Sequence, residues 1–244
     1  MQDYDLNKGN APFEEKIADL EVYFRTKKLG KPEAKVLLES KINKVFKKAS
    51  GVDVKHVDVS EYYEPFIHIS GTYRIIYLKR KPIELPISHE VIGAKVCPDC
   101  NNVYEVGEAL EGETQKKRNL PIDVILKLVH ELGDVDLAFD FKGKEMDAQK
   151  MTSWKLEKAS PKFVEDNKNS IRRFSVTPQE AIDRLRKKIA IRPHDTRRIL
   201  EEVFEVTKNE IILHPLFIYT LQYQEETKKV QIDAITEKFE ILKQ

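Results

Sequence analysis

Two cysteines separated by two residues are the sharpest chemical feature of the sequence. The segment 97–100, Cys-Pro-Asp-Cys, has the spacing with which two thiolates bind one metal ion or form a redox pair. Redox pairs of this spacing lie at a helix N-terminus, where the helix dipole lowers the pKa of the first thiol. The residues at 101–106 are instead strand-like, and Asn101 tolerates a left-handed turn. The pattern therefore favours a metal-binding turn between two strands.

The number of metal ligands stays open. The cysteine turn resembles half of a zinc ribbon, and structural zinc takes four ligands, usually Cys and His. No second CxxC exists, but His89 precedes Cys97, and His56 and His68 fall in neighbouring predicted strands. A second copy or a partner could supply the rest. We expect Cys97, Cys100 and His89 to bind zinc, with a disulfide or redox pair and a plain turn as alternatives.

A second candidate site is the basic segment 168–198. Ten Lys or Arg residues against three carboxylates give it a net charge of +7, in a chain with a net charge of +1. Clustered arginines bind phosphates, so the segment predicts contact with nucleic acid or another anionic partner. The alternative is a solvated face whose cations pair with carboxylates of the same chain. The candidates are Arg172, Arg173, Arg184, Arg186, Lys187, Lys188, Arg192, Arg197 and Arg198.

Tyrosines on predicted strands form a third set. A tyrosine on a strand can stack on a base or form an interface hot spot. The alternative is that it covers the edge of a hydrophobic core. The candidate interface aromatics are Tyr63, Tyr73, Tyr77, Tyr219 and Tyr223.

Motifs of the common enzyme classes are absent. The sequence contains no GxxxxGK[ST], GxGxxG, HExxH or GxSxG. Asp134, Asp136 and Asp140 are the best candidates for a cation or acid–base site, and an acidic loop explains them equally well. We therefore expect a protein without catalytic activity.

The composition is that of a globular protein outside the membrane. Of 244 residues, 41% are hydrophobic and 34% charged, mostly Lys, Glu and Arg, a balance typical of thermophiles. No apolar run is long enough to span a bilayer, and the acidic N-terminus does not read as a signal peptide. Two cysteines are too few for a disulfide framework. We expect a cytoplasmic protein.

The N-terminal part predicts two helices followed by a sheet. Apolar residues recur every three or four positions at 12–28, and again from Pro32 to about residue 48, as on a buried helix face. Across 57–87 the period changes to two, which predicts three or four antiparallel strands. Pro65 and Gly71 would separate them.

The C-terminal third predicts the same order of elements. Thr177-Pro178-Gln179-Glu180 forms a capping box, after which Ile182, Leu185 and Ile189 make a helical stripe. A second short helix would start at Pro193. Strands are expected at 211–213, 216–223, 228–234 and 238–242.

Matching landmarks in the two parts suggest a duplication. Between them, 121–132 predicts a helix, 135–141 a strand and 142–168 a linker. The predicted fold class is α+β, with two tandem helix-plus-antiparallel-sheet modules joined by a partly helical insert. The expected domains are the N-terminal module at 1–103, the insert at 104–170 and the C-terminal module at 171–244.

The last strands resemble a known kind of module. The segment 229–241 is similar to the ending of PepSY- or cystatin-like modules, which pack one helix across a curved antiparallel sheet. It departs from them at Glu237, where such modules usually carry Gly. The resemblance implies a topology for the C-terminal module and no functional residues.

A protein of this kind is expected to bind something. We expect a non-catalytic adaptor or regulatory protein that acts through protein–protein contacts, either with a partner or by self-association. The cysteine turn would stabilise the first module or close a dimer, and zinc is the one cofactor expected. The alternative is a nucleic-acid-binding protein that uses the segment 168–198.

Overall fold

The computed structural model describes most of the chain as two compact units. The described residues are 4–47, 53–88, 91–95, 103–105 and 118–242. Unit 1 consists of Met1–Glu14, Arg74–Glu131 and Arg192–Val203, and unit 2 consists of Glu15–Tyr73, Leu132–Ile191 and Phe204–Gln244.

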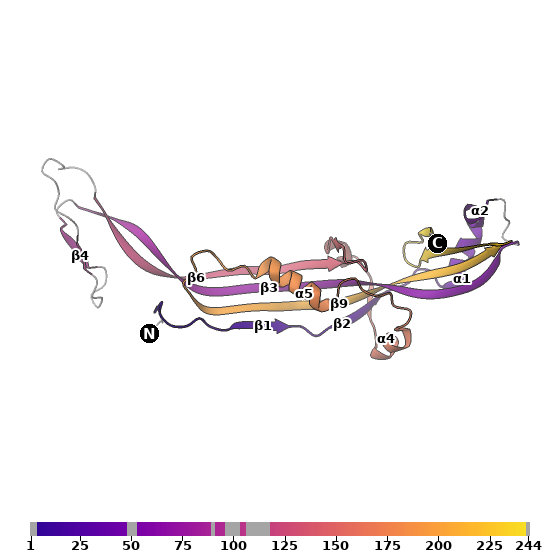
Figure 1. The fold of residues 1–244 in the computed structure, drawn as a ribbon, viewed down its shortest axis with the longest axis horizontal. Helices are drawn as coiled ribbons and strands as arrows, with labels where there is room; N and C mark the ends of the chain where they lie inside the picture. The colour runs from indigo at the N-terminus through magenta and orange to yellow at the C-terminus, as the bar shows by residue number, and fades with distance from the viewer. Residues whose placement is uncertain (1–3, 48–52, 89–90, 96–102, 106–117, 243–244) are drawn as a thin grey trace. The chain divides into compact units, whose positions relative to one another are not determined.

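Strands dominate the chain and account for about half of the described residues, whereas helices account for less than a fifth. Three long strands, drawn as ribbons in Figure 1, are β3 (Lys55–Ile87), β6 (Arg118–Phe139) and β9 (Arg198–Tyr223). The shorter strands are β1 (Phe13–Ile17), β2 (Glu21–Arg25), β4 (Gly93–Lys95), β5 (Val103–Glu105), β7 (Glu145–Met146), β8 (Leu156–Lys158), β10 (Glu226–Asp233) and β11 (Phe239–Leu242).

Nine of the described strands form one mixed sheet. Its main order is β11-β10-β9-β3-β6-β7, with β1 and β2 also paired to β9 and β8 paired to β2. The β2–β9 ladder is parallel, whereas the ladders of β10 with β9 and with β11 are antiparallel. A separate two-stranded sheet joins β4 to β5.

The predicted fold class is therefore wrong. The chain does not form two tandem helix-plus-sheet modules, because β3 and β9, assigned to different modules, are neighbours in one large mixed sheet. The similar spacing of landmarks in the two parts reflects long alternating strands. Long strands with both faces partly covered have similar sequence patterns, because apolar and polar residues alternate in each of them.

Two of the predicted helical regions are confirmed. α5 (Pro178–Ile189) begins with the expected capping box of Thr177 and Glu180, and its stripe of Ile182, Leu185 and Ile189 is buried. The helix expected after Pro32 is confirmed as α1 (Lys31–Ser40) and α2 (Ile42–Val45). The capping box is a local signal, so it survives an error in the overall fold.

Three predicted helices are wrong. The residues at 12–28 form β1 and β2, those at 121–132 belong to β6, and no helix follows Pro193. In β6, a helical stripe at Ile122, Ile125 and Val129 coincides with an apolar residue at every second position. Such a run fits both periods, and pairing with β3 selects the strand.

The expected breaks within 57–87 are also wrong, because β3 continues through Pro65 and Gly71. A Cβ atom at Gly71 would lie 2.6 Å from the backbone oxygen of Glu205. The glycine therefore permits a close approach of β9 to β3 within unit 2, rather than a turn.

Unit 2 contains three described hydrophobic clusters. The first packs α1 and α2 against β9 and β10, with Phe217 and Ile232 in its centre. The second surrounds Tyr63, and the third surrounds Met151 with Trp154 packed against it. The expected linker at 142–168 contributes short elements to unit 2: β7, α3 (Gln149–Thr152), β8 and α4 (Pro161–Asn167).

Candidate functional site

Strand β6 has one open edge within unit 1. One edge of β6 pairs with β3, while β7 on the other edge pairs only with Ala138 and Phe139. From Asn119 to Glu131, no described strand lies on this second edge. We call this stretch the β6 edge.

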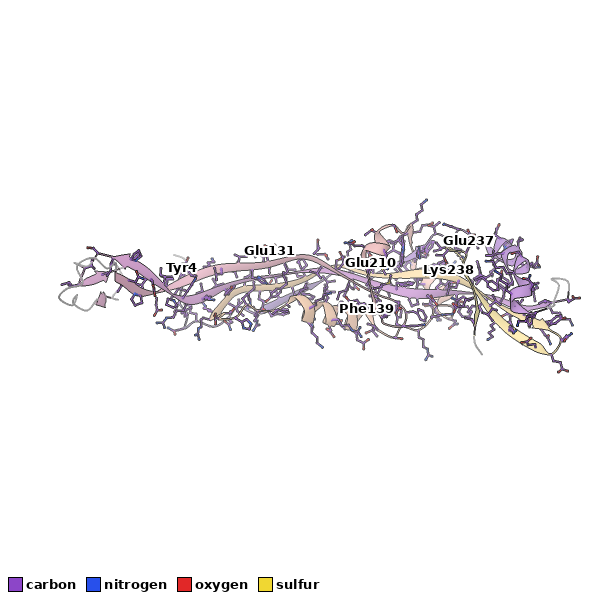
Figure 2. The ribbon with its side chains drawn as sticks, turned by 90° about the horizontal axis from the view of Figure 1, so that it is seen from above. Tyr4, Glu131, Phe139, Glu210, Glu237 and Lys238 are labelled. Atoms are coloured by element: carbon purple, nitrogen blue, oxygen red, sulfur yellow. The ribbon has the colours of Figure 1, made fainter. Side chains whose placement is uncertain are left out.

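Side chains of the β6 edge alternate between two environments. At even positions, Leu120 and Ile122 are buried, and Val124, Leu126 and Leu128 are half-buried. At odd positions the side chains are exposed, including Glu131, which Figure 2 labels on this strand. The exposed set is Asn119, Pro121, Asp123, Ile125, Lys127, Val129 and Glu131.

Ion pairs connect the exposed face of β6 to the rest of unit 1. Asp123 accepts a hydrogen bond from Arg80, and Arg74 lies 4.0 Å from Glu131 and also pairs with Glu201. Along these contacts the residue number in β3 falls from 80 to 74 while that in β6 rises from 123 to 131, as is required of antiparallel neighbours. Lys127 makes no ion pair with any described residue.

An open strand edge presents a row of unpaired N–H and C=O groups. Such a row can accept an extended segment of another chain, whose side chains then contact both faces of the sheet. The β6 edge is long enough for this, and it offers an apolar face and a face with alternating charges.

A buried histidine in unit 2 lies between two carboxylates. His68 in β3 is 7% exposed; its Nδ1 lies 2.9 Å from Glu210 in β9, and its Nε2 lies 3.1 Å from Asp136 in β6. Ser70 donates a hydrogen bond to the same oxygen of Asp136. We call these four residues the His68 network.

Hydrogen bonding sets the charge of the His68 network. The hydrogen bond to Glu210 raises the pKa of His68, although burial opposes this. Burial also acts to raise the pKa of Asp136, but hydrogen bonds from Ser70 and His68 lower it overall. The arrangement therefore favours a protonated imidazole that donates to both carboxylates.

A second buried histidine in unit 2 has a different pair of neighbours. His214 is 5% exposed; its Nδ1 lies 2.7 Å from Nη1 of Arg25, and its Nε2 lies 3.0 Å from Asp233. The guanidinium of Arg25 stacks 3.9 Å from the ring centre of Trp154. The β2–β9 register places Phe24 beside Leu213, which brings Arg25 to His214.

The neighbours of His214 assign its tautomer. Arginine can only donate, so Nδ1 accepts from Arg25 and the proton on Nε2 is donated to Asp233. Burial acts to raise the pKa of Asp233, but hydrogen bonds from His214 and Thr236 hold it far below its ordinary value. The positive charge of this cluster therefore resides on Arg25.

The predicted zinc ligands Cys97, Cys100 and His89 lie outside the described residues. The strands on either side of the cysteine turn are described: β4 and β5 pair antiparallel, with Lys95 opposite Val103. His56 lies 3.9 Å from Glu39 in unit 2. Within the described part of the chain, no group of three or more His, Cys, Asp and Glu side chains is arranged to bind a metal.

Most of the predicted basic residues contact acceptors within their own unit. In unit 2, Arg172 pairs with Glu64, Arg186 with Glu15 and Asp183, and Lys188 with Glu145, while Arg184 lies 3.5 Å from the Gly143 oxygen. In unit 1, Arg192 pairs with Glu202, and Arg198 donates to the Asp5 and Gly9 oxygens. Among the described residues, no side-chain ion pair is made by Arg173, Lys187 and Arg197.

The predicted interface tyrosines are mostly buried. The exposed fraction is 4% for Tyr63, 0% for Tyr73, 7% for Tyr77 and 2% for Tyr219. Tyr223 is half-buried and lines a pocket of 790 Å³ in unit 2 together with Phe46. Four of the five tyrosines therefore offer little surface for stacking.

Sequence reasoning did not find the β6 edge or the two histidine networks. The strand itself, though not its place at an edge, could have been recognised from Leu120 onward, where apolar residues occupy every second position. His68 was considered only as a metal ligand. The hydrogen bonds of His68 depend on partners in β6 and β9, and no local sequence pattern predicts these partners.

No family model, curated protein or solved structure matches this chain. Among the residues that the structure describes, no helix is long and apolar enough to cross a membrane.

Proposed function

We propose that this protein is a non-catalytic adaptor that binds an extended protein segment along the β6 edge. The observation that carries the proposal is the open edge from Asn119 to Glu131. Its apolar residues alternate with exposed charged and aliphatic ones.

Strand addition can supply both affinity and selectivity at such an edge. Each new backbone hydrogen bond contributes about 0.5–1.5 kcal/mol, so several are needed for stable binding. The half-buried side chains of Val124, Leu126 and Leu128 would become further covered by apolar residues of the added strand. The pattern therefore selects partners with alternating apolar residues.

Peptide display tests the proposal without knowledge of the natural partner. A random peptide library is selected on the full-length chain, and the bound peptides are then tested against Ile125→Pro and Leu126→Pro. Successive N–H groups of an antiparallel strand point to opposite edges. One of the two prolines therefore removes an N–H donor of the open edge, and the other removes an N–H donor to β3. The variant with the lower melting temperature is the one that has lost the hydrogen bond to β3.

The expected peptides have apolar residues at every second position. These peptides should bind the proline variant that lacks the open-edge donor about tenfold or more weakly than the wild type. When bound to the wild type, they should slow hydrogen–deuterium exchange at 119–131. The matched control is Glu240→Pro in β11, which should leave binding unchanged. Peptides indifferent to the β6 proline would overturn the proposal, as would a selection that yields no binder to a chain that is monomeric in solution.

Zinc binding at Cys97 and Cys100 is the second part of the proposal. It is supported by β4 and β5, which have three residues each and pair with no further described strand. Such a short hairpin is marginally stable in water unless something holds it, and a metal at its turn would do so.

Elemental analysis of the purified chain tests this part. We expect one zinc per chain or per two chains, and a loss of stability in a Cys97→Ser, Cys100→Ser variant. Absence of metal together with an unchanged melting temperature would exclude the zinc site.

A further inference from the structure

We infer that the segment bound along the β6 edge is the β6 edge of a second copy of this chain, in antiparallel register about Ile125. This inference rests on the proposed function, for which it names the partner. The argument for it comes from the order of charges and apolar residues along the strand.

The exposed face of β6 is complementary to itself in this register. Two antiparallel copies centred on Ile125 place Asp123 of each copy opposite Lys127 of the other, on both sides of an Ile125–Ile125 contact. Directly opposed charges of opposite sign stabilise a strand pair. Lys127 makes no ion pair with any described residue of its own chain, so the second copy would supply its counter-charge.

The other face of β6 is complementary in the same register. Val124 comes to lie opposite Leu126, and Ile122 opposite Leu128. The side chains at 124, 126 and 128 are half-buried in the single chain, so the pairing would cover apolar surface that water now reaches.

Registers centred on the neighbouring odd-numbered residues are less favourable. Centring the pair on residue 127 places Lys127 opposite itself and Asp123 opposite Glu131. Centring it on residue 123 places Asp123 opposite itself, and centring it on residue 129 places Asp134 and Asp136 opposite Val124 and Ile122. Like charges in direct opposition destabilise a strand pair, as does an apolar side chain opposed to a carboxylate.

A two-fold symmetric pair of this kind is closed. Each copy uses the same surface, so association stops at the dimer and does not continue into a filament. Pairing also removes the open edge of both copies, which would otherwise invite less specific association.

Charge reversal provides a decisive test. Mass is measured by size-exclusion chromatography with light scattering over a range of protein concentrations. The wild type should form a dimer, and Asp123→Lys or Lys127→Asp alone should raise the dimer dissociation constant by about tenfold or more, because each puts like charges in opposition twice. The double variant Asp123→Lys, Lys127→Asp should recover the wild-type value.

Mixing the two single variants makes the test independent of their individual folding. The Asp123→Lys chain carries Lys at both positions and the Lys127→Asp chain carries Asp at both, so the mixture should form heterodimers. Arg80→Gln is the matched control: it removes the ion pair between Arg80 and Asp123 and should leave the dimer intact.

The outcomes separate this inference from the proposed function. A wild type that stays monomeric while displayed peptides still bind β6 would overturn self-pairing and leave strand addition standing, with another protein as the occupant. A dimer that is insensitive to both charge reversals would overturn the register. A monomer to which no peptide binds would overturn both.

Discussion

An exposed ion pair of unit 1 and two buried histidine clusters of unit 2 place charged groups in different surroundings. In unit 1, Arg80 and Asp123 form an ion pair whose side chains are 59% and 43% exposed. In unit 2, His68 and His214 are 7% and 5% exposed and meet carboxylate partners. The Arg80–Asp123 pair therefore lies in water, whereas the two histidines lie in the protein interior.

Exposure determines what each arrangement contributes. Water and salt screen an exposed pair, which contributes about 0–1 kcal/mol to stability. Removal of one partner inside the protein leaves a polar group unpaired, at a cost of about 1–3 kcal/mol. The Arg80–Asp123 pair therefore contributes little to stability, whereas the buried histidines hold specific strands of unit 2 together.

The largest expected difference between the units concerns apolar side chains. Ile232→Ala in unit 2 removes a side chain with 0% exposure from the cluster around Phe217, and should lower the free energy of unfolding by about 2–5 kcal/mol. Ile83→Ala in unit 1 truncates a side chain that is 37% exposed, and should cost less than about 1 kcal/mol. Urea denaturation measures both. Equal losses would mean that Ile83 is covered in solution.

Breaking the His68 network should have the next largest effect. His68→Gln keeps a polar side chain but loses the charge and has one donor nitrogen in place of the two that face Glu210 and Asp136, so we expect a loss of about 1–3 kcal/mol. Arg80→Gln in unit 1 should cost at most about 1 kcal/mol. The same denaturation experiment compares them, and a larger loss for Arg80→Gln would reverse the contrast drawn between the units.

The His68 network should also make stability depend on pH. Because the folded pKa of His68 is raised, its contribution is fully present below its unfolded pKa of about 6.5 and is lost as pH rises through the folded pKa. The free energy of unfolding of the wild type, minus that of His68→Gln, should therefore decrease from about pH 6 upward. A difference that grows with pH would show that the imidazole is neutral in the folded chain.

The contrast between α5 and β6 shows what the sequence could reveal. The capping box at Thr177 satisfies free N–H groups with residues three positions apart, so α5 was correctly predicted from local chemistry. The apolar residues of β6 fit a helix and a strand alike, and only pairing with β3, a distant segment, decides between them. The contacts of Gly71 and His68 also depend on long-range strand pairing, which could not be predicted from the sequence.

The candidate site follows the same rule. The strand-like residues after the cysteines were predicted correctly, since Val103–Glu105 is β5. The β6 edge was missed because an edge is defined by which strands are neighbours. That order is a property of the whole sheet, and no single segment encodes it.

The smallest expected effects concern two turns with a positive backbone φ. Glu237 in unit 2 has φ 59° between β10 and β11, and Asp195 in unit 1 has φ 65°. Glycine adopts this region without strain, so Glu237→Gly should raise the free energy of unfolding by about 0.4–1 kcal/mol.

Asp195→Gly is the matched variant in unit 1 and should gain less. Aspartate tolerates a positive φ better than glutamate, and Asp195 also accepts a hydrogen bond of 3.0 Å from Lys79, which glycine would lose. Thermal melting of the two variants beside the wild type checks the order. A larger gain for Asp195→Gly would mean that backbone strain at this turn outweighs the contribution of the exposed ion pair between Asp195 and Lys79.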